Sequence, residues 1–322
     1  MAFGPETAAG LKMQAQHRSL GDGRLHFQHG PMDIVLGASG DSVALQQAHA
    51  QAWERFRGLL QELVDELPGL QAPVDGLCTL RGTVARRMWA AAEVHRPAFV
   101  TPMVAVAGAV AQELLLAYDR PGINRAWVNN GGDIALHLTP GTSFRIGLLA
   151  QIERQAQWHD AGGLQVDGKF DVTHESGVRG VATSGWRGRS FSLGIADSVT
   201  VLAASSAEAD AAASLIGNAV NVDVLGIKRV PANQLKDNSD LGNIPVTVDV
   251  PQLTPSQAAE ALLAGRKHAM ALREAGHIQA CFITCQGWTV STQTGGAEPL
   301  SLNNLQRTST SGQSACVLEL YP

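Results

Sequence analysis

Residues 127–135 read Trp127-Val128-Asn129-Asn130-Gly131-Gly132-Asp133-Ile134-Ala135, a polar turn between two apolar, strand-like runs. The two amides and the carboxylate need partners, because a polar group left unpaired in an apolar core costs about 1 to 3 kcal/mol. A glycine pair permits positive φ angles and lets another molecule approach the backbone closely. Two interpretations therefore stay open: a tight hairpin, for which Asn-Gly is a standard signal, and a turn that contacts a ligand.

The composition predicts a globular protein with a large core, since 45% of the 322 residues are hydrophobic and 16% are charged. Lys and Arg number 24 against 29 Asp and Glu, and aromatic residues make up 5%. This balance argues against a nucleic-acid partner and against an anionic membrane surface. The sequence shows neither an apolar run of the roughly 18 residues that a membrane span requires nor the layout of a secretory signal, so we expect a cytoplasmic protein.

The fold class follows from the order of the predicted elements. Strands are predicted at 24–36 (broken at His29-Gly30-Pro31), 125–129, 133–138, 144–149, 168–173, 177–184, 190–203, 244–250, 277–284 and 315–320. Helices are predicted from Asp41 to Leu67, from Thr83 to His95, from Thr101, from Ser205, and from Thr254 to Gly276. Short consecutive strands without long crossovers favour antiparallel pairing, so we predict an α+β fold with helices packed on a mainly antiparallel sheet.

We expect one domain over residues 24–322, preceded by a mobile leader at 1–23. Residues 291–313 are rich in Ser, Thr, Asn, Gln and Gly, which is typical of a loop or a partly disordered segment. The strand at 315–320 is expected to rejoin the sheet.

The predicted helix at 102–112 is apolar and small on nearly every side, which indicates a buried, closely packed helix. Its partner is either another element of the chain or a second copy of the protein. The second alternative predicts a homodimer.

Asp210, Ser214 and Asn218 lie at i, i+4 and i+8 of a predicted alanine-rich helix. A carboxylate one turn from a hydroxyl is a plausible partial shell for a hard cation such as magnesium. The alternative is an ordinary polar stripe that faces solvent.

A third candidate segment is the predicted strand ending at 180–189, where Thr183 and Ser184 precede Arg187 and Arg189. Arginines at a strand end can pair with phosphate or carboxylate, although an exposed loop with incidental arginines is the alternative. The pair Cys281 and Cys285 falls on a predicted strand and is interpreted as core thiols, with a redox or metal role as the minority alternative.

Together these segments resemble the ApbE superfamily, whose founding members are FAD:protein FMN transferases. The resemblance covers about residues 24–279 and rests on Asn129-x-Gly131-Gly132-Asp133-Ile134, Val181-Ala182-Thr183-Ser184-Gly185, Asp197-Ser198-Val199-Thr200-Val201 and Ala209-Asp210-x-x-x-Ser214. Three segments, His29-Gly30-Pro31-Met32-Asp33-Ile34, Pro102-Met103-x-Ala105-Val106-Ala107-Gly108 and Asp240-Leu241-Gly242, are more similar to a smaller ApbE-related branch of bacterial and archaeal proteins.

The resemblance implies an ApbE-like (T-fold-like) architecture with a ligand cleft between residues 130–133 and 210–214. In the transferases the turn contacts the flavin, and the helix motif holds magnesium that polarises the pyrophosphate. In this chain, the resemblance assigns the metal to Asp210 and Ser214. It assigns the ligand to Asn129, Asn130, Gly131, Gly132, Asp133, Thr183 and Ser184. Arg187 and Arg189 are candidate anion partners.

One family segment is missing. Where the transferases carry His-x-x-Asp-Pro-x-Thr-Gly, this chain reads Ser190-Phe191-Ser192-Leu193-Gly194-Ile195-Ala196-Asp197. A phosphoryl-transfer site depends on positioning and charge stabilisation, so this loss predicts a changed substrate.

Our leading hypothesis is a transferase-like or hydrolase-like enzyme that acts on a small anionic or heteroaromatic ligand, with magnesium. The alternatives are a flavin transferase with a remodelled site (binding FAD or FMN), a sulfur-assimilation or small-molecule degradation enzyme, and a non-catalytic ligand-binding protein. The sequence singles out no covalent nucleophile with its base.

Overall fold

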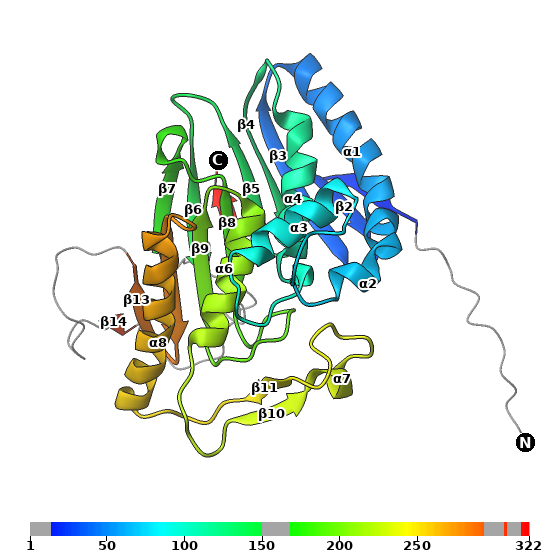
Figure 1. Ribbon diagram of the computed structural model, residues 1–322. Helices are drawn as coiled ribbons and strands as arrows, with labels where there is room; N and C mark the ends of the chain where they lie inside the picture. The colour runs from blue at the N-terminus through cyan, green and yellow to red at the C-terminus, as the bar shows by residue number, and fades with distance from the viewer. Residues whose placement is uncertain (1–13, 150–167, 293–305, 308–316, 322) are drawn as a thin grey trace, which may run out of the picture.

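The computed structural model describes residues 14–149, 168–292, 306–307 and 317–321 and shows an α+β fold built on one large antiparallel sheet (Figure 1). The sheet order is β1-β2-β3-β4-β5-β8-β9-β12-β13-β14. These strands are β1 (Gln16–Ser19), β2 (Leu25–His29), β3 (Met32–Gly40), β4 (Ile123–Asn130), β5 (Asp133–Leu138), β8 (Gly180–Ser184), β9 (Ser198–Ala203), β12 (Ala280–Cys285), β13 (Trp288–Ser291) and β14 (Gln306–Arg307). The predicted fold class is confirmed.

The helices that cover this sheet lie on one face of it (Figure 1). They are α1 (Ser42–Asp65), α3 (Thr83–Glu93), α4 (Val106–Leu115), α6 (Ser206–Ala219) and α8 (Pro255–Glu274), with short turns α2 (Leu67–Leu70), α7 (Ala232–Leu235), η1 (Pro102–Ala105), η2 (Leu116–Tyr118) and η4 (His174–Ser176). Within the described ranges, no helix combines the length and apolarity needed to cross a bilayer.

Local sequence signals start the helices where they were predicted. The Asp41 carboxylate accepts hydrogen bonds from the backbone N–H groups of Val43 and Ala44 at the start of α1. Thr254 and Gln257 form a complete capping box at α8, and Ser205 caps α6. Thr101 was expected to cap a helix, but its hydroxyl donates to Asp240 Oδ2 (2.5 Å) instead, and a 3-10 turn precedes α4.

Both faces of the central strands are buried. On β5, Ala135 packs towards α1, α3 and α4, whereas Ile134, Leu136 and Leu138 pack on the opposite face against a second sheet. This sheet has the order β15-β6-β7, formed by β6 (Ser143–Leu149), β7 (Gly168–Thr173) and β15 (Val317–Tyr321). Because side chains alternate between the two faces of a strand, the large sheet packs against helices on one face and against the second sheet on the other, which gives three layers.

Two strand predictions are corrected, and a third strand lies outside the large sheet. The strand at 315–320 does not rejoin the main sheet; β15 pairs antiparallel with β6, whose free edge supplies its backbone partners. The strand predicted at 244–250 is confirmed as β11 (Pro245–Asp249), which pairs with β10 (Lys228–Pro231) in a separate two-stranded sheet. The strand predicted at 190–203 begins only at Ser198, because the backbone at Gly194 lies against the carbonyls of Gly217 and Val220 as a loop.

The chain enters the sheet earlier than expected. The leader predicted at 1–23 contains β1, whose residues Gln16–Ser19 pair antiparallel with β2, since a neighbouring strand supplies the backbone partners that a free leader lacks. Residues 1–13 and most of the predicted loop 291–313 lie outside the described residues.

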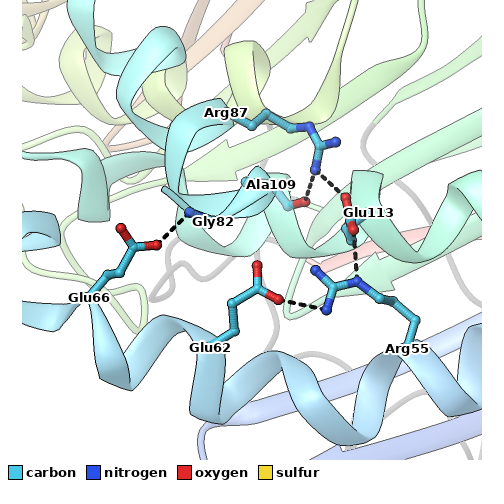
Figure 2. A network of polar contacts seen from close by, with 7 residues as sticks. All are labelled: Arg55, Glu62, Glu66, Gly82, Arg87, Ala109 and Glu113. Carbon is cyan, nitrogen blue, oxygen red and sulfur yellow. Dashed lines mark hydrogen bonds and ion pairs between the residues drawn. The ribbon is translucent and has the colours of Figure 1, made fainter. Parts of the chain in front are cut away.

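A buried ion network fixes α4 against α1 and α3 (Figure 2). Glu113 on α4 is 9% exposed and accepts hydrogen bonds from Arg55 Nε at 2.8 Å and Arg87 Nη1 at 2.9 Å. Burial alone would raise the pKa of Glu113, but the two guanidinium groups outweigh it and lower the pKa. One carboxylate therefore ties three helices together.

Replacing Glu113→Gln should lower the free energy of unfolding by about 2 kcal/mol, because two partly buried guanidinium groups lose their counter-charge. Urea unfolding followed by circular dichroism measures this change. The matched control is Glu54→Gln, since Glu54 is 69% exposed and pairs with Arg57 on the surface of α1; it should cost less than about 0.5 kcal/mol. Equal effects of the two variants would contradict a structural role for the network.

His95, which follows α3, is 7% exposed, and its Nδ1 has no hydrogen-bond partner. Burial, together with the nearby His268 and His277, lowers its pKa from 6.5 to about 4. The folded protein therefore favours neutral His95, and the resulting stability is present above pH 6.5 and is lost as the pH falls towards 4.

Between pH 6.5 and pH 4 the protein should lose about 3 kcal/mol of stability through His95. A His95→Gln variant should lack this part of the acid dependence, as measured by urea unfolding across this pH range. His174→Gln, at a residue whose side chain is 35% exposed, serves as control and should keep the dependence. If His95→Gln loses as much stability between pH 6.5 and pH 4 as the wild type, His95 is not the source of this pH dependence.

Candidate functional site

The turn between β4 and β5 is a two-residue hairpin. Asn130 pairs with Asp133 across it, and Gly131 and Gly132 have φ angles of 68° and 115°. These positive angles explain the two glycines, because residues with a Cβ rarely adopt them. The hairpin interpretation is therefore correct, and it leaves the polar side chains beside the turn to be explained.

The side-chain amides of Asn129 and Asn130, beside the turn, form hydrogen bonds within the protein. Asn129 Oδ1 accepts a hydrogen bond from Gly132 N at 2.8 Å, and Asn130 Nδ2 donates to the carbonyl of Ala107 at 3.1 Å. Asn130 is 7% exposed, so it connects the hairpin to the start of α4 rather than to solvent.

Two buried carboxyls from distant segments lie behind the turn, near enough for the charge of Asp210 to act on Asp133. Asp133, the first residue of β5, is 8% exposed and accepts from Thr183 N at 3.3 Å. Asp210, on α6, accepts from Gly108 N at 2.9 Å. Burial, and then the charge of Asp210, raise the pKa of Asp133 well above its usual value, against the lowering effect of the Thr183 N–H.

Burial also raises the pKa of Asp210 to about 7, although the N–H groups of Ala107 and Gly108 oppose this. Because the folded-state pKa of Asp210 is raised from 3.8, the stability that its neutral form contributes is present below pH 3.8 and is lost as the pH rises through about 7. In the absence of a cation, the protein holds these two carboxyls together at a cost in stability.

The close approach of α4 and α6 positions Asp210. Ser206 Oγ donates to the carbonyl of Gly108 at 2.7 Å, and a Cβ at Gly108 would overlap the Ser206 carbonyl and come within 2.9 Å of Asp210 Cβ. The amides at the start of α4 thus point at a carboxylate, as the helix dipole favours.

The hydroxyls predicted beside the turn lie on two faces of the sheet. Ser184 Oγ faces α6, 3.9 Å from the position a Cβ would take at Gly217. Thr183 Oγ1 instead pairs with Thr200 Oγ1 at 3.0 Å, so only the backbone N–H of Thr183 reaches Asp133. Thr183 and Ser184 are adjacent on β8, and successive side chains of a strand point to opposite faces of the sheet.

Ser214 lies one turn beyond Asp210 on α6 and is partly buried. Asn218, one turn further, accepts from Leu193 N at 2.9 Å and from Ser192 Oγ at 3.4 Å. The polar stripe is therefore not an ordinary solvent-facing surface, because its far end anchors the loop at 190–197.

The two arginines have different neighbours. Arg189 donates to the carbonyl of Pro31 at 3.3 Å, and its Nη1 lies 3.1 Å from the position a Cβ would take at Gly131, so it borders the turn. Arg187 stacks on the Trp186 ring at 4.5 Å. Its charge partly offsets the burial that raises the pKa of Asp197.

Sequence reasoning missed the backbone amides of Ala107 and Gly108 as partners of Asp210. It also missed Asp197, which is 7% exposed and accepts from Trp186 Nε1 and Gln286 N. The signal in the sequence that could have indicated the Ala107 and Gly108 amides was Gly108 itself, a glycine inside a helix predicted to be buried. Cys281 and Cys285 are buried in the core, where burial raises the pKa of both thiols.

Within the described ranges, no three His, Cys, Asp or Glu side chains gather as a metal-binding group. A cation at this site would therefore rely on two carboxylates, neighbouring hydroxyls, waters and a ligand.

Comparison with known proteins shows the family. The model of the AbpE bacteria family matches residues 15–292, and the chain belongs to this family. Proteins named UPF0280 protein are similar to it: one from Methanosphaerula palustris is 37% identical over 205 residues (62% of this chain, 79% of that protein). One from Methanothermobacter thermautotrophicus is 33% identical over 164 residues (50% of this chain, 58% of that protein). In a third, from Methanospirillum hungatei, the match covers 46% of the relative, so the chain spans about half the length of the last two relatives.

Gly108→Ala should destabilise the protein by about 2 kcal/mol or more, since the added methyl group meets backbone of α6 that cannot yield freely. Gly58→Ala is the matched control, because Gly58 is also helical but has open space at its Cβ position; it should raise stability by about 0.5 to 1 kcal/mol. Thermal unfolding compares the two. A tolerated Gly108→Ala would contradict the close crossing of α4 and α6.

Proposed function

We propose that the protein is an enzyme that acts on a small anionic or heteroaromatic ligand beside the Asp133–Asp210 pair, with magnesium as its cation. The observation that carries this proposal is the pair itself. Two acidic side chains that repel each other in a buried position lower stability, and such arrangements concentrate where a protein binds or transforms a ligand. We place this activity in the cytoplasm.

The donor set fits magnesium. Magnesium prefers oxygen ligands and is often held by one or two carboxylates, the other positions being filled by waters and ligand phosphates. Asp133 and Asp210 would supply the carboxylates, and Ser214 a hydroxyl within one turn of Asp210. The cation would act as a Lewis acid on the bound ligand.

The chain's own residues would orient the ligand. The N–H groups of Ala107 and Gly108 hold Asp210, and Asn130 fixes the hairpin to the same helix start. Arg189, exposed beside Gly131, is the proposed partner for a ligand anion.

The loop at 190–197 supports a substrate other than the flavin of the ApbE transferases. Its backbone and side chains are bound by Asn218 and by β11, where Thr247 N donates to the Ser192 carbonyl at 2.8 Å. The transferase segment with its histidine and proline has no counterpart there. A transferase reaction on FAD is therefore the alternative outcome of the test.

The test combines thermal unfolding with a reaction assay. Above pH 7 and in the absence of divalent cations, Asp133→Asn should raise the melting temperature by about 2 °C or more, because the amide replaces a carboxyl whose ionisation is opposed by burial and by the charge of Asp210. Magnesium should stabilise the wild-type protein and should no longer stabilise Asp133→Asn or Asp210→Asn. Asp223→Asn, at an exposed position with the same charge change, should keep the response to magnesium.

The reaction assay incubates the protein with FAD and magnesium and separates AMP and FMN by chromatography, in parallel with a thermal-shift screen of flavins and small heteroaromatic acids. Stabilisation by an acid without cleavage of FAD is the expected result. AMP release that disappears in Asp210→Asn would favour the flavin transferase instead. An equal magnesium response in the wild type and both variants would refute the metal role.

A further inference from the structure

Residues 228–249 form an arm that belongs to neither of the two larger sheets and lies below the large sheet in Figure 1. The arm consists of β10, α7, a tip loop at 236–244 and β11. Among the residues that the structure describes, none of those in the arm belongs to the four apolar clusters of the core. The arm therefore packs apart from the core, and hydrogen bonds fix where its tip lies.

Two hydrogen bonds hold the tip of the arm. The Asp240 carboxylate accepts from Thr101 Oγ1 at 2.5 Å, and the Asn238 carbonyl accepts from Gln71 Nε2 at 2.8 Å. Thr101 is 3% exposed, so its hydroxyl depends on this partner rather than on water. Gly242, with a φ of 52°, closes a turn that contains Asp240, which explains the glycine of this segment.

The Thr101 hydroxyl is the group expected to cap the helix that follows it. A capping hydroxyl accepts from an N–H group of the first helical turn. Here Thr101 makes no such bond; its hydroxyl is directed at Asp240, and the next four residues form the 3-10 turn η1. Four residues of 3-10 helix advance the chain about 2 Å further than four residues of α-helix, so η1 displaces the chain from Val106 onwards.

The late start of α4 leaves free the amides that Asp210 uses. Ala107 and Gly108 are the second and third residues of α4, and N–H groups of a first turn have no partner inside their helix. In an α-helix that began at Pro102, these two N–H groups would bond to carbonyls one turn earlier. The Asp210 carboxylate, which accepts from Gly108 N at 2.9 Å and from Ala107 N, would then lose both donors.

We infer that Asp240 is a positioning residue for the Asp133–Asp210 site. Through the Thr101 hydroxyl it prevents capping at Thr101, delays the start of α4, and so reserves two backbone amides for Asp210. The consequence for magnesium binding rests on the proposed function, whereas the start of α4 is a property of the metal-free protein.

The test follows the metal-free, full-length protein by NMR, through the Gly108 amide proton and the ¹³Cα shifts of residues 103–105. Asp240→Leu and Thr101→Val each remove the bond between the arm and η1. In both variants the ¹³Cα shifts should move towards α-helical values, and the Gly108 amide proton should move upfield as it leaves the carboxylate. Asp240→Asn keeps an oxygen acceptor and Thr101→Ser keeps the hydroxyl, so both should retain the wild-type shifts.

Gln71→Leu is the matched control, because it removes the other hydrogen bond to the arm tip and leaves Thr101 and Asp240 paired. It should not change the shifts of residues 103–108. Magnesium affinity, measured by thermal shift, should fall about fivefold in Asp240→Leu and Thr101→Val, the effect of a weakened hydrogen bond to a ligating carboxylate, and should stay at the wild-type value in Gln71→Leu.

Wild-type shifts in both Asp240→Leu and Thr101→Val would overturn the inference, and so would the same shift changes in Gln71→Leu. If one of the two variants does not fold, the other decides. A wild-type protein that does not respond to magnesium would refute the magnesium proposal alone, because the shifts are measured without metal.

Discussion

The structure depends on the close contact between α4 and α6 at Gly108. Its N–H donates to the Asp210 carboxylate, and its carbonyl accepts from the Ser206 hydroxyl, so one residue without a side chain binds α6 at two successive turns. Because both helices lie on the same face of the large sheet, their separation sets how near Asp210 comes to Asp133 on β5. The acidic pair is thus a consequence of helix packing.

The rest of the helical layer maintains that contact. Glu113, further along α4, is held by Arg55 of α1 and Arg87 of α3, which fixes the orientation of α4 from its other end. Asn130 fixes the start of α4 to the β4–β5 hairpin. The small side chains of α4 serve this packing within one chain: Gly108 meets α6, and Ala109 and Ala111 are fully buried. The packing of this helix is thus explained by partners within one chain, and the homodimer stays a prediction.

The proposed ligand site lies beside this contact, since Asp210 is one of its two carboxyls. The Asp133–Asp210 pair brings two acidic groups together in a buried position, where burial raises the pKa of both. The protein holds this pair at a cost in stability. Such costs are typical of sites where a partner molecule completes the interactions.

Local sequence patterns determined the α+β class, the starts of α1 and α8 at Asp41 and Thr254, and the hairpin at Gly131-Gly132, because capping and turn chemistry act within a few residues. They also marked Asp133 and Asp210 as candidates. Only the tertiary structure decided that these two carboxyls lie near each other, that the Thr183 hydroxyl pairs with Thr200 instead, and that β15 joins β6 in a second sheet. The physical reason is that periodicity specifies which residues share a face of an element, whereas the partner of that face is chosen by packing between segments far apart in the chain.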